Sequence, residues 1–297
     1  MLAFLPRWFR APLALLLIVL NTLAHTLPLL GLALLKAAVP IPAWRRNCSV
    51  GLARVAESWI GVNGALFSLL TRTRFLVEGT GGLTAGKNYL VLANHQSWVD
   101  IPVLQKVLNR KIPFMRFFLK QELIWVPVLG LAWWALDFPF MRRHGRSTLA
   151  KNPHMRNADV AATRRACERF RGLPVSLMNF AEGTRFSPAK HARQNSPYRR
   201  LLKPKAGGVA FVLEAMGESL HAVLDATVVY PAGIPGMRDL LAGRIPEVRV
   251  YLRELPVPRE LAGDYEHDPA CRVRVQRWIN EIWRDKDALL AKDLASS

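Results

Sequence analysis

The segment Asn94–Asp100 places a histidine and an aspartate five residues apart, directly after the apolar run 89–93. An imidazole can take a proton from a hydroxyl group near neutral pH, and a carboxylate at one ring nitrogen orients the ring and leaves the other nitrogen free. Such a run and turn are typical of the carboxyl end of a buried strand, where open α/β sheets bind their ligands. His95 and Asp100 are therefore predicted to be a general base and its orienting residue. The spacing also suits a structural histidine beside an aspartate that starts a helix.

Other patterns in the chain do not support a competing chemistry. His154 and Asp159 have the same spacing, but they lie in or beside the basic segment 144–157, which we expect to be a solvated loop. Residues 81–87 have the spacing of a phosphate-binding loop, yet Asn88 stands where a magnesium-binding serine or threonine is needed. A Gly-x-Ser-x-Gly elbow does not occur in the sequence, which argues against the usual α/β serine hydrolase.

A second group of candidate residues follows the apolar run 175–180. Glu182, Gly183, Thr184 and Arg185 succeed one another there. A glycine lets backbone amides approach an anion, and a guanidinium group can hold two phosphate oxygens at once. This segment is therefore predicted to bind an anion. The alternative is a structural ion pair between Glu182 and Arg185.

The apolar runs that carry these residues alternate with helical stretches, which predicts an α/β fold with a mostly parallel sheet flanked by helices. Strands are expected at 75–78, 89–93, 139–141, 175–180, 226–230 and 248–252, helices at 160–171, 205–216 and 271–294, and a surface loop at 190–203. Since parallel strands end at the same edge of a sheet, we expect His95 to meet Arg143 and the segment 182–185. A base beside guanidinium groups suits a reaction on a phosphate-bearing alcohol.

Composition and charge narrow the class of protein. The chain has 297 residues, of which 51% are hydrophobic, so it is too apolar to be a disordered basic tail. Its net charge of +19 attracts polyanions, either nucleic acid or anionic lipid headgroups. Cys48, Cys167 and Cys271 are too far apart in sequence for a zinc module or a secreted disulfide framework, and we expect reduced thiols.

The N-terminal part of the sequence favours the lipid surface. Residues 11–35 contain no charged side chain, and as a helix they would reach roughly 37 Å, enough to cross a bilayer core. Trp8 and Trp44 bracket this segment, as interfacial tryptophans do, and a second helix is expected at 50–70. We predict an N-terminal membrane anchor over residues 1–72, either a single span or a two-helix hairpin, followed by a catalytic domain over residues 73–297.

Four segments occur in the order of the four sequence blocks of glycerolipid acyltransferases: Asn94-His95-x-x-x-x-Asp100, Phe140-Met141-Arg142-Arg143, Phe180-x-Glu182-Gly183-Thr184-Arg185 and Val228-Val229-Tyr230-Pro231. On these residues the chain resembles the 1-acyl-sn-glycerol-3-phosphate acyltransferase family, in particular the branch with bacterial inner-membrane and lysocardiolipin acyltransferase-like members. The resemblance covers residues 75–257, and its first and third blocks are the specific ones. Arg142 stands where an acidic residue is frequent in the family, so it either favours a more anionic headgroup or points to solvent.

The resemblance implies acyl transfer from an acyl thioester, acyl-CoA or acyl carrier protein, to the free hydroxyl of a lysophospholipid, with lysophosphatidic acid as the first choice. His95, oriented by Asp100, would take the hydroxyl proton. Five residues would hold the acceptor phosphate and headgroup: Arg143, Glu182, Gly183, Thr184 and Arg185. Four further candidates for the site are Asn94, Arg142, Lys205 at a Gly-rich helix start, and Pro231. Neither a metal ion nor another cofactor is implied.

Several alternatives remain open at this stage. The acceptor could instead be lysocardiolipin or lysophosphatidylglycerol, and the segment 123–136 is either a core helix or the lining of an acyl-chain tunnel. A noncatalytic basic membrane-tethered scaffold or nucleic-acid-binding protein is the alternative of another class. The sequence lacks an RNA-binding or recognition-helix signature, so no nucleic acid is expected. We expect a membrane location, the inner membrane in a bacterium, with the catalytic domain on the cytoplasmic face where acyl thioesters are made.

Overall fold

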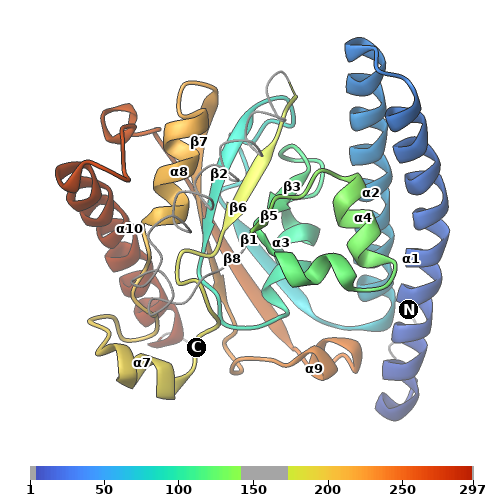
Figure 1. Ribbon diagram of the computed structural model, residues 1–297. Helices are drawn as coiled ribbons and strands as arrows, with labels where there is room; N and C mark the ends of the chain where they lie inside the picture. The colour runs from blue at the N-terminus through green and yellow to red at the C-terminus, as the bar shows by residue number, and fades with distance from the viewer. Residues whose placement is uncertain (1–4, 142–172, 296–297) are drawn as a thin grey trace.

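A six-stranded sheet forms the centre of the molecule in the computed structural model, which describes residues 5–141 and 173–295 (Figure 1). Its strand order is β1-β8-β7-β2-β6-β3. The strands are β1 (Arg74–Glu78), β2 (Asn88–Ala93), β3 (Met115–Phe117), β6 (Ser176–Asn179), β7 (Leu220–Val229) and β8 (Glu247–Leu255). β7, β2, β6 and β3 are parallel neighbours, whereas β8 is antiparallel to β7 and parallel to β1. The predicted α/β fold with a mostly parallel sheet is confirmed.

One expected strand lies outside this sheet. β5 (Phe140–Met141) pairs with β4 (Leu119–Lys120) in a separate two-stranded parallel sheet. The expectation that the run 139–141 ends at the edge of the main sheet is therefore wrong. The Leu119 N–H donates to the Pro139 carbonyl at 2.9 Å, so this run is held beside β4. Arg142 and Arg143, which come next, lie outside the described residues, as do His154, Asp159, Cys167 and the helix expected at 160–171.

The central strands are buried on both faces, so their sequence is apolar without alternation. In β2, Leu90 and Leu92 pack with α8 (Gly207–Met216) and α10 (Pro269–Ala295), while Tyr89 and Val91 pack with α3 (Asp100–Leu108) on the opposite face. Figure 1 shows α8 and α10 on one side of the sheet and α3 on the other. The helices predicted at 205–216 and 271–294 are confirmed to within about two residues.

The N-terminal segment forms a helical hairpin of α1 (Arg7–Ala38) and α2 (Pro42–Leu70), which lie side by side in Figure 1. Polar groups of α1 face α2, since Asn21 Nδ2 donates to Asn63 Oδ1 at 2.9 Å and the His25 ring contacts the Ser58 hydroxyl at 3.1 Å. Many leucines of α1 are exposed instead, Leu27 at 75% and Leu34 at 71%. α1 is the one described helix that is long and apolar enough to cross a membrane.

Shorter elements surround this framework. α2 packs against α3, and α1 packs against α4 (Leu129–Ala135) and α9 (Met237–Leu241). The segment 123–136 is not one helix but a 3-10 turn, η1 (Gln121–Trp125), followed by α4. A second 3-10 turn, η2 (Arg259–Leu261), links β8 to α10. The surface loop expected at 190–203 begins inside a helix, α7 (Pro188–Gln194), because the Ser187 hydroxyl accepts from the Lys190 amide and caps its first turn.

Candidate active site

The turn between β2 and α3 brings His95 and Asp100 together. The Nδ1 atom of His95 lies 2.9 Å from Oδ2 of Asp100, and the same oxygen accepts hydrogen bonds from the backbone N–H groups of Gln96 at 2.7 Å and Ser97 at 2.8 Å. Asp100 is fully buried in the first turn of α3, where the helix dipole favours a negative charge. The spacing read from the sequence thus corresponds to a direct contact between carboxylate and ring.

The orientation of the His95 ring follows from this contact. A neutral imidazole that donates from Nδ1 to a carboxylate has its lone pair at Nε2, the tautomer required to accept a proton. Within the described residues, no hydrogen bond involves Nε2. The Phe180 ring stacks on the imidazole at a centroid distance of 3.9 Å and an interplanar angle of 18°. With its side chain 14% exposed, His95 is sheltered and still reachable.

Glu182 is placed differently from the sequence-based expectation. Its carboxylate is fully buried and accepts the backbone N–H groups of His95 and Leu202, each at 3.0 Å. Both oxygens are therefore used inside the protein, and a carboxylate would in any case repel a phosphate. Burial, partly offset by these two hydrogen bonds, raises the pKa of Glu182 to about 7. Glu182 ties the β6 turn to the backbone of the β2 turn, which the sequence could not indicate.

Arg185 lies beside the β2 turn, as the shared sheet edge predicts. Its guanidinium carbon is 4.4 Å from the centroid of the Trp98 ring, a residue that the sequence analysis did not select. The Phe186 N–H donates to the His95 carbonyl at 2.7 Å, which holds the backbone next to Arg185 against the histidine. Within the described residues, no carboxylate forms an ion pair with Arg185. Its guanidinium group is thus available to an anion near His95.

Two lysine side chains also lie beside the segment 182–185. Lys190, another residue absent from the sequence prediction, donates from Nζ to the Thr184 hydroxyl at 2.8 Å and to the Arg185 carbonyl at 2.9 Å. Gly183 has a φ of +69°, which favours glycine, and a Cβ atom there would lie 3.1 Å from Nζ of Lys205. The Lys205 N–H also donates to the Ala181 carbonyl at 2.7 Å. The structure therefore brings Lys205 next to the segment 182–185, although the two are distant in sequence.

The two remaining predicted residues, Asn94 and Pro231, lie at the ends of β2 and β7. Asn94 is fully buried and its amide exchanges two hydrogen bonds with the backbone of Val228 on β7, each 2.9 Å long. Pro231 follows the end of β7 at the same edge of the sheet and is half-buried. Tyr230, which precedes it, donates from its hydroxyl to Oδ1 of Asp100 at 2.8 Å. The sequence signal for Tyr230 was its place in the fourth block, but only its contact with Asp100 indicates what the side chain does.

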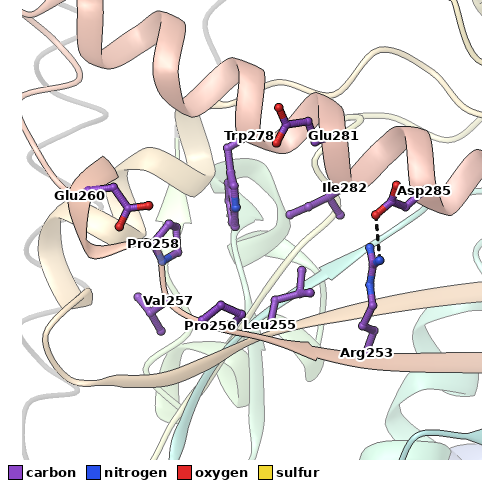
Figure 2. Close-up of a pocket in the computed structure, with 10 residues that line it drawn as sticks. All are labelled: Arg253, Leu255, Pro256, Val257, Pro258, Glu260, Trp278, Glu281, Ile282 and Asp285. Atoms are coloured by element: carbon purple, nitrogen blue, oxygen red, sulfur yellow. Dashed lines mark hydrogen bonds and ion pairs between the residues drawn. The ribbon is translucent and has the colours of Figure 1, made fainter.

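A separate cavity of about 330 Å³ lies between α10 and the chain that leads from β8 into η2 (Figure 2). Leu255, which lines it, pairs with Val223 near the start of β7, whereas Ala93 pairs with Ala226 further along the same strand. Since His95 lies beyond Ala93, the cavity lies toward the opposite edge of the sheet. Its walls combine apolar side chains such as Trp278 with the Arg253–Asp285 ion pair, which is 2.8 Å long. It is therefore distinct from the candidate active site.

The fold and the sequence are similar to those of known proteins. The fold matches the crystal structure of the 1-acyl-sn-glycerophosphate (LPA) acyltransferase PlsC from Thermotoga maritima with a TM-score of 0.53 and 18% identity, covering 93% of this chain and 97% of that one. Residues 74–234, more than half of the sequence, match the Acyltransferase family model. The chain belongs to the Acyltransferase family.

Curated relatives place the chain near two kinds of glycerolipid enzyme. Lysocardiolipin acyltransferase 1 is 26% identical over 84% of this chain in Gallus gallus and 29% identical over 80% in Danio rerio. The 1-acyl-sn-glycerol-3-phosphate acyltransferase gamma of Mus musculus is 22% identical over 73% of this chain. The chain spans 65%, 61% and 56% of the length of these three relatives.

Proposed function

We propose that this protein transfers a fatty acyl group from an acyl thioester to the free hydroxyl of a lysophospholipid, with lysophosphatidic acid as the acceptor and phosphatidic acid as the product. The observation that carries this proposal is the His95 ring, bound to Asp100 through Nδ1 and unpartnered at Nε2 within the described residues, with Arg185 at the neighbouring turn. Membership of the Acyltransferase family supports the reaction class. The two relatives named for 1-acyl-sn-glycerol-3-phosphate and lysocardiolipin support a lysophospholipid acceptor.

The proposed reaction needs one base and no covalent enzyme intermediate. His95 Nε2 accepts the proton of the acceptor hydroxyl as its oxygen attacks the thioester carbonyl. The carbon–oxygen bond of the new ester forms, the carbon–sulfur bond breaks, and the protonated ring returns its proton to the leaving thiolate. Asp100 stabilises the ring while it is positively charged. Most of the rate enhancement comes from holding the two reactants together in the correct orientation.

Arg185 is proposed to hold the acceptor phosphate. Its guanidinium group lies over Trp98, which is only three residues from His95, and stacking on the ring restricts its orientation. Lys205, next to Gly183, adds a second positive charge at the same corner. Arg142 and Arg143 remain proposed contributors. Thr184 is held by Lys190 and is proposed to shape the turn, with its hydroxyl as a secondary contact.

A second acceptor, lysocardiolipin, is favoured by one observation. The relatives named as lysocardiolipin acyltransferase 1 match this chain at 26% and 29% identity over at least 80% of its length, against 22% over 73% for the gamma enzyme. Lysocardiolipin carries two phosphates where lysophosphatidic acid carries one, and a site with several cationic side chains suits either headgroup. The reaction and the base are the same in both cases.

The α1–α2 hairpin is proposed to lie in the surface of the membrane and not to cross it. α1 presents exposed leucines on one side and bonds α2 on the other. It also packs against α9, so an upright crossing would draw the charged Arg238 and Asp239 toward the bilayer. A tag before residue 5 and a label in the turn 39–41 should be accessible from the same side of sealed vesicles, whereas a crossing would separate them.

The experiment that tests the function is an acceptor screen on the purified full-length chain in phospholipid vesicles. Release of free thiol from oleoyl-CoA or an oleoyl acyl carrier protein is followed with lysophosphatidic acid, monolysocardiolipin, lysophosphatidylglycerol or no acceptor. The proposal predicts release that depends on a lysophospholipid and yields the esterified lipid, with lysophosphatidic acid giving the highest kcat/KM. Thiol release that is independent of every acceptor would contradict it. A preference for monolysocardiolipin would move the assignment to the second acceptor.

A further inference from the structure

We propose that Tyr230 is a positioning residue for the acyl transfer, because its hydroxyl holds the Asp100 carboxylate in the orientation that keeps the His95 ring aligned. This inference rests on the proposed function, since it assigns Tyr230 a task in the action of His95 as a base. Tyr230 itself touches neither acceptor nor donor in this account. It acts from the end of β7, a strand whose pairing partner β2 ends just before His95.

The two oxygens of Asp100 have unequal partners. Oδ2 faces the His95 ring and the N–H groups of Gln96 and Ser97, all from the same turn. Oδ1 receives one hydrogen bond within the described residues, from the Tyr230 hydroxyl at 2.8 Å. Because Asp100 is fully buried, loss of that hydroxyl would leave an anionic oxygen without a donor among the described residues, and the carboxylate would no longer be held from the β7 side.

The backbone fixes where the hydroxyl lies. The Asn94 amide accepts from the Val228 N–H and donates to the Val228 carbonyl, so the ends of β2 and β7 keep a fixed register immediately before His95. Tyr230 is two residues beyond Val228 and 4% exposed. Burial, together with the Asp100 charge, raises the pKa of Tyr230 well above its ordinary value, so the phenol remains a hydrogen-bond donor throughout the working pH range. Asn94 thus fixes the end of β7 against β2, and Tyr230 extends from that end to Asp100.

The Tyr230 hydroxyl also reduces the negative charge of Asp100 that faces the His95 ring. A carboxylate that shares its charge with a phenol attracts a protonated imidazole less than one that lacks this donor. Other charged groups face the site from the β6 turn and from α10: Glu182 bonds the His95 backbone, Arg185 lies over Trp98, and the buried Lys286 acts on Glu182. These groups are the same with and without the Tyr230 hydroxyl. A comparison of Tyr230→Phe with the wild type therefore isolates the effect of the hydroxyl.

The test is the steady-state kinetics of Tyr230→Phe as a function of pH. Because the variant loses one hydrogen bond to a charged group, we expect a roughly tenfold lower kcat, with both KM values unchanged within about twofold. Without the phenol, more negative charge faces the ring, so the acid limb of the kcat/KM profile should move to higher pH. Tyr198→Phe is the matched control: Tyr198 is also buried, but its hydroxyl donates to the Asn280 carbonyl at 3.3 Å, away from His95. It should leave kcat and the acid limb unchanged.

The outcomes separate this inference from the proposed function. If the wild type releases thiol, His95→Ala does not, and Tyr230→Phe matches the wild type in kcat and pH profile, the Tyr230 inference is overturned alone. If the wild type has no activity, the proposed function fails first. Should Tyr230→Phe not fold, the tyrosine at position 230 is replaced by 3-fluorotyrosine, which keeps the ring and the hydroxyl group and makes the hydroxyl a stronger donor. A changed kcat with unchanged KM values supports the inference, and kinetics identical to those of the wild type contradict it.

Discussion

Two buried carboxylates from different turns form hydrogen bonds with His95, and they have different roles. Asp100, in the turn after β2, contacts the imidazole itself and is surrounded by hydrogen-bond donors: the ring, two backbone amides and a phenol. Glu182, in the turn after β6, accepts hydrogen bonds from the backbone at His95 and Leu202. One carboxylate orients the reacting ring, and the other joins the loops that carry the ring and the anion-binding residues.

The difference has an electrostatic consequence. Four donors suit an ionised carboxylate, which is what a histidine base needs beside it. Among the described residues Glu182 has two donors in an equally buried place, and its pKa is raised to about 7, so it titrates near neutral pH. Two acidic residues bonded to one histidine should therefore respond differently to substitution and to pH. Substitutions at each turn test whether the two carboxylates differ in this way.

The largest effect is expected for Asp100→Asn. An asparagine amide can hold the ring in the opposite tautomer, and it cannot stabilise the positive charge that develops on His95. We expect kcat to fall by about two to three orders of magnitude, no more than loss of His95 itself costs, with little change in the KM of the acceptor. Turnover of the folded variant, measured as thiol release, checks this. A loss of less than tenfold would remove Asp100 from the role of orienting residue.

A smaller effect is expected for Arg185→Ala. Loss of a guanidinium group that binds phosphate should raise the acceptor KM by about 10- to 100-fold, whereas the donor KM stays within about twofold. Arg193, exposed on α7, gives a matched loss of one positive charge, and Arg193→Ala should leave both constants unchanged. An acceptor KM that responds equally to both variants would indicate general attraction by the basic surface and not a phosphate site at Arg185.

The smallest effect on catalysis, and a clear effect on stability, is expected for Glu182→Gln. Burial raises the folded pKa of Glu182 from 4.5 to about 7. Because the folded pKa is the higher one, its contribution to stability is fully present below about pH 4.5 and is lost as the pH rises through 7. The wild type should thus lose up to about 3 kcal/mol of unfolding free energy between pH 5 and pH 8 that the glutamine variant keeps.

Urea unfolding of both proteins at several pH values measures this difference, since other titrating groups are common to the two. Activity of the variant should fall only a few-fold, because glutamine still accepts one of the two backbone hydrogen bonds. Identical pH slopes for the two proteins would contradict the assignment of Glu182 as a neutralisable buried group. A loss of activity as large as that of Asp100→Asn would erase the distinction between the two carboxylates.

The sequence predicted the parts of this arrangement that depend on local patterns. Apolar runs at 89–93 and 175–180 mark β2 and β6, and both candidate turns follow them, so the meeting of His95 with Arg185 could be expected from parallel strands alone. The antiparallel direction of β8 could not, because strand pairing depends on contacts across the chain. The run 139–141 has the same local pattern, but as β5 it pairs with β4 outside the main sheet.

The contacts that distinguish the two carboxylates lie beyond sequence reasoning. Tyr230 is 130 residues from Asp100, and Leu202 is 20 residues from Glu182, so neither spacing predicts a bond. Glu182 and Arg185 looked like one anion-binding pair because they are neighbours in sequence. The turn instead directs the carboxylate into the core, while the guanidinium group lies over Trp98. A positive φ at Gly183 between them is the local feature that permits this divergence.

The central claim is that His95 is the base, and turnover of His95→Ala tests it most directly. With lysophosphatidic acid and oleoyl-CoA, the variant should release thiol about two to four orders of magnitude more slowly than the wild type, while its melting temperature and vesicle binding stay the same. Thiol release by folded His95→Ala at a rate close to that of the wild type would contradict the account.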